Sequence, residues 1–298
     1  MRFIRYDFRK DGDVMILVTG ATGTVGRPIV ELLATQGVRV RAVTRSPESA
    51  VLPAGVDVVA GDPAWPDTLA DALDGASAAF LHPRAVGDAA FEFAELAGKR
   101  GVRRLVALSA INIDDPLDAQ PSRFRGDRNR EAEQAVVGSG LEWVSLRASS
   151  FAMNVVQSGW NAQIRAGDVV RGPYAEFAES PLHEGDIAAV AAHAFLTDDL
   201  LGERVELTGP HSLTHADMVR IIGDVIGRPL RYEEVPAAVV RQGTVARGFP
   251  EDFVDSLLTR YADGVGQPAP VTDQVEKILG RTRTFANWAA DNAAAFRN

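Results

Sequence analysis

Residues Ile16-Leu-Val-Thr-Gly-Ala-Thr-Gly-Thr-Val-Gly26 combine a short apolar run with three glycines at a fixed spacing. The run Ile16–Thr19 has the aliphatic composition of a buried strand. Gly20, Gly23 and Gly26 follow with the spacing of a tight turn that opens a helix. The stretch therefore predicts a strand, a glycine turn and a helix in direct succession.

Each glycine has its own physical role in such a turn. The first allows the sharp bend, the second lets a pyrophosphate approach the backbone, and the third lets the helix pack closely on the strand. Free N–H groups at the helix N-terminus would then bind the phosphates. We therefore predict a dinucleotide site formed by Gly20, Thr22, Gly23, Thr24, Val25 and Gly26.

The segment after the second predicted strand indicates which dinucleotide binds. NAD sites usually place Asp or Glu there, where it binds the ribose 2′-hydroxyl. Here the strand Val38–Val43 is followed by Thr44, Arg45 and Ser46, without a carboxylate. Arg45 stands where a 2′-phosphate would lie, which favours NADPH/NADP as cofactor. Asp62, after the third predicted strand, is expected to bind the adenine amino group, with a local turn beside Pro63 as the alternative.

The first half of the chain alternates apolar runs with helical patterns. This rhythm is typical of the α/β class and predicts a doubly wound parallel Rossmann sheet. The predicted strands are Val14–Thr19, Val38–Val43, Val56–Ala60, Ala78–Leu81, Leu105–Ser109 and Trp143–Arg147. The predicted helices are Val25–Gln36, Trp65–Leu73, Gly87–Arg100 and Ser122–Val137.

The rhythm weakens after Arg147, which predicts a smaller, mostly helical C-terminal substrate lobe. We expect a flexible extension over 1–14, an NADP-binding Rossmann domain over 15–153 with a return near 183–209, and the lobe over 154–182 and 210–298. The later predicted elements are helices Asp186–Leu196, Thr214–Ile226, Ala237–Ala246, Glu251–Ala262 and Phe285–Phe296, with strands Arg204–Leu207 and Leu230–Glu234.

Composition excludes several function classes. The 298 residues carry a formal net charge of -9, which disfavours a nucleic-acid partner. No apolar stretch approaches the roughly 20 residues of a membrane helix, and the N-terminus lacks a secretion signal, so we expect a cytoplasmic protein without a membrane partner. The chain has no cysteine, and His211 with His215 lacks a third ligand, so we expect no metal site.

With these motifs in place, the chain resembles the NmrA-like group of atypical short-chain dehydrogenases/reductases. Its nearest likeness is to NADPH-dependent quinone oxidoreductases (type 2) and actinomycete polyketide-quinone reductases. The matching segments beyond the glycine turn are Val43–Pro47, Gly101–Ser109, Ser139–Arg147, Phe151–Asn154, Leu182–Ala188 and Leu207–Thr214. The resemblance implies the fold and the cofactor and says little about the substrate.

One departure from that family bears on the chemistry. Its ordinary relatives use a Tyr-x-x-x-Lys pair as proton donor, and those positions here correspond to Arg125 and Asn129. The segment Ser122–Arg130 contains neither tyrosine nor lysine, while Ser109 keeps the family's serine position. Ketone reduction creates an alkoxide that needs a positioned acid, whereas a quinone gives a stable hydroquinone anion. We therefore expect an NADPH-dependent oxidoreductase that reduces an aromatic quinone or similar conjugated acceptor.

The candidate residues beyond the cofactor site divide into two groups. His82, Ser109 and Asn129 are the candidate catalytic residues, with loop or structural roles as the alternative. Arg125, Phe151 and Asn154 are the candidate contacts for a small aromatic substrate. A solvated helix face is the alternative for Arg125, and domain-junction packing is the alternative for the other two.

Other functions stay open from the sequence. The reductase could support oxygenation or hydroxylation of a polycyclic aromatic polyketide in antibiotic biosynthesis, acting as a monooxygenase alone or with a protein partner in a two-component reaction. A non-catalytic NADP-binding redox sensor of the NmrA type also suits the missing tyrosine. A nucleotide-sugar epimerase is disfavoured by that same departure.

Overall fold

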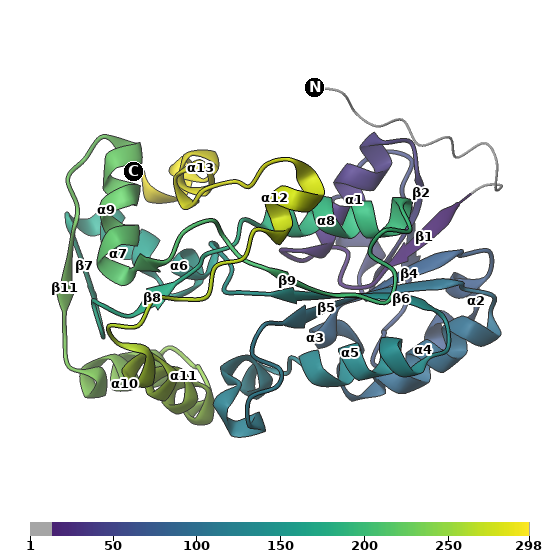
Figure 1. Cartoon of the computed structure of the whole chain (residues 1–298), viewed down its shortest axis with the longest axis horizontal. Coiled ribbons are helices and arrows are strands. Elements are labelled where there is room, and N and C mark those ends of the chain that lie inside the picture. The colour runs from purple at the N-terminus through teal and green to yellow at the C-terminus, as the bar shows by residue number, and fades with distance from the viewer. Residues whose placement is uncertain (1–13, 298) are drawn as a thin grey trace. The chain divides into compact units, whose positions relative to one another are not determined.

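The computed structural model describes residues 14–297 (Figure 1). All but the last residue of the expected extension over 1–14 lies outside this range. The chain divides into two compact units. The first contains the described residues up to Ala110, Asp127–Arg147 and Ile187–Val205; the second contains Ile111–Gly126, Ala148–Asp186 and the residues from Glu206. The units are nearly equal in length, and Ile111–Gly126 belongs to the second, whereas the sequence placed it in the first.

A seven-stranded sheet with the order β3-β2-β1-β4-β5-β6-β9 forms the frame of the first unit. Its strands are β1 (Met15–Val18), β2 (Arg39–Thr44), β3 (Asp57–Ala60), β4 (Ala78–Leu81), β5 (Arg104–Ala110), β6 (Glu142–Ala148) and β9 (Arg204–Leu207). The pairs β1–β2, β2–β3, β1–β4 and β4–β5 are parallel. The order reverses between β1 and β4, and ligands of doubly wound sheets bind where the order reverses. The predicted Rossmann sheet is therefore confirmed.

Helices cover both faces of this sheet. Figure 1 shows α1 and α8 on one side and α3, α4 and α5 on the other. Their bounds, with the short α2, are α1 (Gly26–Thr35), α2 (Ala70–Leu73), α3 (Pro83–Val86), α4 (Ala90–Lys99), α5 (Asn129–Gly138) and α8 (Glu184–Leu196). Leu17, Leu81, Phe93 and Val136 are fully buried in one apolar cluster. Coverage on both faces explains why the central strands read as continuous apolar runs.

The predicted helix Ser122–Val137 is wrong as a continuous element. Pro121–Arg125 forms a 3₁₀ helix, and Gly126 then takes a φ of 91°. That left-handed conformation ends a helix and suits glycine. A second helix, α5, begins only at Asn129. The positions compared with the Tyr-x-x-x-Lys pair therefore lie on two separate elements.

The second unit contains two small sheets and several helices. β7 (Val169–Gly172) pairs in parallel with β11 (Arg231–Glu234), and β8 (Ala178–Glu179) pairs antiparallel with β10 (Leu213–Thr214). The helices are α6 (Asn154–Gln157), α7 (Trp160–Ala166), α9 (His215–Ile226), α10 (Ala237–Ala246), α11 (Glu251–Gly264), α12 (Gln274–Leu279) and α13 (Phe285–Asp291). Trp288 and Phe285 stack in its core with centroids 5.4 Å apart.

A capping box begins α9. The Thr214 hydroxyl accepts a hydrogen bond from the Asp217 backbone N–H at 3.0 Å, and the Asp217 carboxylate accepts one from the Thr214 N–H at 3.2 Å. This reciprocal arrangement satisfies two N–H groups that the helix itself cannot. It fixes the point at which β10 passes into α9.

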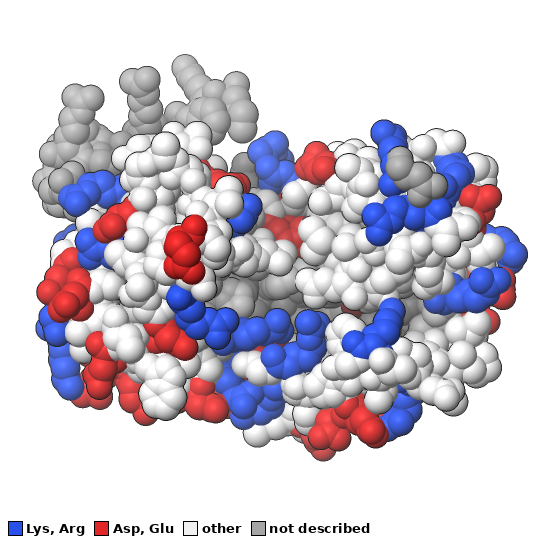
Figure 2. Space-filling view, turned by 180° about the vertical axis from the view of Figure 1, so that it is seen from behind, with Lys and Arg blue, Asp and Glu red and all other residues white. Residues whose placement is uncertain are grey.

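Two surface properties follow from the described residues. None of the helices within 14–297 combines the length and the apolar character needed to cross a bilayer. On the face that Figure 2 displays, basic and acidic side chains lie among each other, so neither sign covers it. The net negative charge of the chain therefore does not make every part of this surface negative.

Candidate functional site

The glycine turn between β1 and α1 has an exposed crest and a buried base. Thr22, Gly23 and Thr24 are exposed, whereas Val25 and Gly26 are buried. The Val25 side chain is thus part of the core, and only its backbone could reach a ligand. The exposed crest therefore holds only three of the six residues that the sequence predicted around the phosphates.

Space around the glycines fits a phosphate cradle. Gly20 has a φ of 64°, and a Cβ there would lie 3.0 Å from the Cβ and Cγ of His82. A Cβ on Gly26 would overlap the Gly20 carbonyl oxygen and lie 2.7 Å from its carbonyl carbon. Any side chain at either position would therefore deform the turn. Gly23 is less confined, with its nearest contact, the Gly20 oxygen, at 3.2 Å.

The N-terminus of α1 offers no competitor for an anion. Val25 at the cap position makes no side-chain hydrogen bond to the helix, and the first turn contains no acidic residue. The positive end of the helix dipole and its N–H groups therefore favour a bound pyrophosphate. Together with the glycine geometry, this fits a dinucleotide phosphate.

The two residues predicted to select and orient the dinucleotide follow β2 and β3. Arg45 is exposed directly after β2, and its side chain makes no hydrogen bond or ion pair with another residue of 14–297. Asp62 follows β3, and its Oδ1 accepts a hydrogen bond from the Ala64 N–H at 3.1 Å. That bond is the local turn which the sequence left as an alternative. The roles of Arg45 at a 2′-phosphate and of Asp62 at adenine stay predictions.

His82 lies next to the glycine turn. Its backbone N–H donates to the Thr19 hydroxyl at 2.8 Å, and its Nδ1 accepts from the Arg84 N–H at 3.3 Å at the start of α3. Burial lowers the pKa of His82, the nearby Arg84 adds to this, and Asp127 opposes it. The ring is therefore neutral near neutral pH, with Nδ1 as acceptor and Nε2–H left as a donor.

Ser109 and Asn129 are brought together in the first unit. The buried Ser109 hydroxyl donates to the Asn129 backbone carbonyl at 3.4 Å, so the end of β5 is joined to the start of α5. One turn further along α5, the Glu133 carboxylate accepts hydrogen bonds from Arg147 and Ser145 of β6. The helix that carries Asn129 is thereby fixed to the sheet.

The three predicted substrate residues lie in the second unit. The Arg125 guanidinium lies 5.3 Å from the ring centroids of both Phe249 and Phe253. Phe151 forms a parallel bridge with Leu182, and Asn154 is the first residue of α6. Their contact with a substrate stays a prediction.

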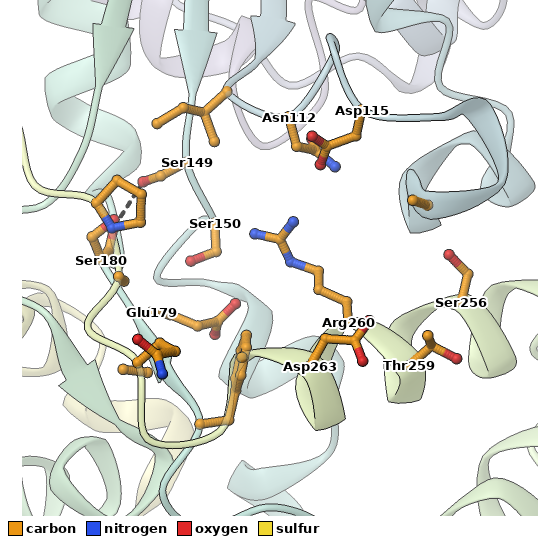
Figure 3. Close-up of a pocket in the computed structure, with 18 of the residues that line it drawn as sticks. Asn112, Asp115, Ser149, Ser150, Glu179, Ser180, Ser256, Thr259, Arg260 and Asp263 are labelled. Carbon is orange, nitrogen blue, oxygen red and sulfur yellow. Dashed lines mark hydrogen bonds between the residues drawn. The ribbon is translucent and has the colours of Figure 1, made fainter.

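A cavity of about 830 Å³ lies within the second unit (Figure 3). Four stretches of chain line it: residues 111–124 in part, 149–150, 177–180 and 252–270 in part. Ile111 and Asn112 directly follow β5 in the chain, and Ser149 and Ser150 directly follow β6. Arg125, Phe151 and Asn154 are not among its described lining residues. Sequence alone does not reveal this cavity, because its walls come from segments far apart in the chain.

The described residues also bear on metal chemistry. Within 14–297 no three His, Asp or Glu side chains are placed to share a metal ion. His215 is buried, and its Nδ1 lies 3.2 Å from the Pro173 carbonyl oxygen. Burial lowers the pKa of His215, while Glu179 and two backbone hydrogen bonds oppose this. His215 therefore belongs to the aromatic packing around Trp160 and Tyr261.

Comparison with known proteins points to nucleotide-dependent redox chemistry. Residues 20–198 match a family model described as NAD(P)H-binding. The (4-alkanoyl-5-oxo-2,5-dihydrofuran-3-yl)methyl phosphate reductase of Streptomyces griseus is 36% identical over 288 residues, which is 95% of this chain and 99% of that protein. The NAD(P)H azoreductase of Xenophilus azovorans is 31% identical over 291 residues, again 95% of this chain and 99% of the other.

A solved structure shows the same architecture. The NADPH-dependent quinone oxidoreductase of Escherichia coli superposes with a TM-score of 0.77 over 94% of this chain and 100% of its own, at 22% identity. At this identity the likeness demonstrates the fold alone. It agrees with the doubly wound sheet and with the resemblance that the sequence indicated.

Proposed function

This chain belongs to the NAD(P)H-binding family, as an NmrA-like NAD(P)H-dependent reductase, and from that premise we propose that it reduces a quinone or a similarly conjugated acceptor with NADPH. The predicted family resemblance and the predicted cofactor class are confirmed by the comparisons. The proposal concerns the acceptor. It rests on one observation: the described residues provide no tyrosine–lysine proton donor.

Two tyrosines within 14–297 have hydroxyls that are unsuited to replace the missing donor. Tyr232 donates its hydroxyl to the Pro173 carbonyl at 2.8 Å in the second unit. Burial raises the pKa of Tyr232, and Glu234 adds to this. Burial likewise raises the pKa of Tyr261. Both hydroxyls are therefore poor acids near neutral pH.

The lysines do not replace it either. Of Lys10, Lys99 and Lys277, the first lies outside the described residues. Lys99 pairs with Glu95 and Lys277 pairs with Asp273, each one helical turn away. The four side chains of these two pairs are exposed, so the pairs are surface features.

An acceptor that tolerates this lack must hold the added electrons itself. NADPH gives a hydride to the acceptor, and water supplies the accompanying proton, which yields NADP⁺ and the reduced acceptor. A quinone becomes a hydroquinone anion. An alkanoyl-furanone ring, as in the name of the Streptomyces relative, becomes an enolate shared by two carbonyl groups. The protein then contributes mainly orientation of the two reactants.

A comparison of two acceptor panels tests the proposal. The purified protein is mixed with NADPH and either menadione or simple ketones such as cyclohexanone, and the loss of NADPH absorbance is followed. We expect menadione to be reduced and the ketones to be inert. Fast ketone reduction with inert quinones would overturn the proposal. NADPH binding without reduction of any acceptor would favour the redox sensor instead.

The same assay addresses oxygenation. A hydroquinone can pass electrons to oxygen, so a reductase could support hydroxylation of an aromatic polyketide. Product analysis after turnover under air and under argon tests this extension. Incorporation of an oxygen atom only under air would support it, and recovery of unmodified quinone and hydroquinone would exclude it.

A further inference from the structure

The cavity of the second unit contains a cation with no partner among the described residues. Arg260 of α11 is partly buried, and Figure 3 shows it extending into the cavity toward the space between Ser150 and Asn112. Its side chain makes no hydrogen bond or ion pair with any residue of 14–297. A guanidinium offers five N–H donors in a planar fork. These donors are therefore available to a ligand in the cavity.

Two neighbouring arginines make contacts that Arg260 lacks. Arg241 of α10 donates to Glu251 at 2.9 Å and to Asp255 at 2.6 Å, which ties α10 to α11. Arg247 lies 5.8 Å from the centroid of the Phe249 ring. These side chains hold the helices together, whereas Arg260 has no such structural contact.

A hydroxyl in the same cavity is also unsatisfied. Ser149 donates its hydroxyl to the Ser180 carbonyl at 2.7 Å. The adjacent Ser150 Oγ is buried and has no hydrogen-bond partner in the described part of the chain. Buried polar atoms without partners are rare in folded proteins, and each calls for an explanation. A ligand oxygen that reaches this end of the cavity would satisfy the hydroxyl and the guanidinium together.

The other charged residues that line the cavity limit the charge that a ligand can have. Arg260 is its only described basic lining residue, and the acidic lining residues are Asp115, Asp118, Glu179, Asp252, Asp255 and Asp263. Asp255 is compensated by Arg241. The carboxylates that still outnumber Arg260 are Asp118, Glu179, Asp252 and Asp263. A doubly charged phosphate would be repelled by this excess of negative charge. A singly charged oxygen on Arg260 would be repelled about half as strongly, and a neutral oxygen would not be repelled.

We propose that this cavity binds the conjugated acceptor and that Arg260 selects acceptors carrying one ionised ring oxygen, as in a hydroxyquinone, over phosphate monoesters. Phe177 and Pro268 supply apolar wall beside these polar groups. This deepens the proposed function and takes the acceptor class from it. The binding step itself needs no turnover and can be measured separately.

Matched ligands and matched variants test the proposal. Lawsone, a naphthoquinone whose hydroxyl is ionised at neutral pH, and menadione, which lacks that hydroxyl, are titrated into the NADP⁺-loaded protein by calorimetry. Arg260→Gln should weaken lawsone about tenfold or more and leave menadione nearly unchanged, as expected for loss of a charge-assisted hydrogen bond. Arg260→Lys keeps the positive charge but not the planar fork of donors, so its affinity for lawsone should lie between those of Arg260→Gln and the original protein.

Arg220→Gln is the control, because Arg220 pairs with Asp217 and Asp224 along α9 and does not line the cavity. An equal loss of lawsone affinity in the control, or an unchanged lawsone-to-menadione ratio in Arg260→Gln, would overturn the role of Arg260. If Arg260→Gln fails to fold, the ratio of lawsone affinity to menadione affinity is measured in Arg260→Lys instead. An unchanged ratio there would likewise overturn the role of Arg260.

A competition experiment tests the selection against phosphate monoesters. An alkanoyl-furanone methyl phosphate and the corresponding free alcohol are each used to displace lawsone from the protein. The proposal expects the alcohol to compete better, and stronger competition by the phosphate would overturn the charge selectivity. Loss of NADPH oxidation with an intact Arg260-dependent binding pattern would sink only the proposed reaction. Intact oxidation without that pattern would sink only this inference.

Discussion

Replacement of Glu133 by glutamine tests how the first unit holds Asn129 beside Ser109. The Glu133 side chain is only 5% exposed and accepts four hydrogen bonds. Oε1 accepts from Arg147 at 2.7 Å and from Arg204 at 2.9 Å; Oε2 accepts from Ser145 at 2.6 Å and from Arg147 at 2.9 Å. These bonds join α5, β6 and β9. Glutamine keeps the shape but turns one acceptor oxygen into an N–H donor facing other donors.

The expected loss follows from that geometry. Breaking a buried ion pair by removing one partner costs about 3–5 kcal/mol. For a unit of this size, each kcal/mol lowers the melting temperature by about 2–4 °C, so Glu133→Gln should melt roughly 10 °C lower. Glu142→Gln is the control, because Glu142 pairs with Arg104 but is 50% exposed. An exposed pair contributes about 0–1 kcal/mol, so the control should melt close to the original protein.

The stability that Glu133 contributes should change with pH in a defined direction. Burial acts to raise the pKa of Glu133, but hydrogen bonds from Arg147, Ser145 and Arg204 outweigh it and lower the pKa below the usual value. The carboxylate therefore stabilises the fold fully above its unfolded pKa of about 4.3, and this stability is lost as pH falls through the lower folded pKa. Thermal melts followed by circular dichroism should show that the melting temperature of Glu133→Gln lies below that of the original protein by a constant amount near neutral pH. This difference should become smaller in acid. Equal melting of the two glutamine variants, or a difference that persists in acid, would refute this reasoning.

Three predictions concern the nucleotide site. Arg45→Ala should raise the Kd of NADPH about tenfold or more and leave NADH nearly unchanged; equal losses in fluorescence titrations would remove its role at the 2′-phosphate. Gly20→Ala should weaken NADPH binding far more than Gly55→Ala. Both glycines have a positive φ, but only a Cβ at Gly20 would contact His82. Similar effects of the two substitutions would show that crowding at Gly20 does not matter. Because burial and Arg84 lower the pKa of His82 against Asp127, NADPH affinity should show no titration step from His82 between about pH 7 and 8. A titration step there that disappears in His82→Gln would contradict a neutral ring.

Local sequence signals predicted the first unit well. The glycine turn and the apolar runs depend on neighbours in the chain, and the structure has both of them. The boundaries of β1 and β4 lie within two residues of the predicted strands. These elements are buried on both faces, so composition alone marks them.

The errors occur where one residue changes the local conformation. Gly126 interrupts an otherwise helical pattern by taking a left-handed conformation, and nothing in the flanking residues distinguishes it from a tolerated helix glycine. α12 was not predicted, because its six residues are too few to show the repeat of apolar positions that marks a helix. The sequence therefore located elements better than it located their breaks.

The cavity that we propose for the acceptor could not be predicted from the sequence for a different reason. Arg260 sits among acidic and apolar residues of an amphipathic helix and reads as an ordinary surface arginine. Its significance comes from Ser150 and Asn112, which tertiary folding brings to the same cavity. Such a combination has no spacing in the chain that could reveal it.

The proposed reaction depends most on a hydride transfer that needs no acid from the protein. Single-turnover oxidation of NADPH by menadione, measured with ordinary and deuterated NADPH in H₂O and in D₂O, tests this directly. We predict that deuterium at the transferred position slows the step and that D₂O leaves it unchanged. A comparable slowing in D₂O would show a proton moving in the same step and would contradict the central claim.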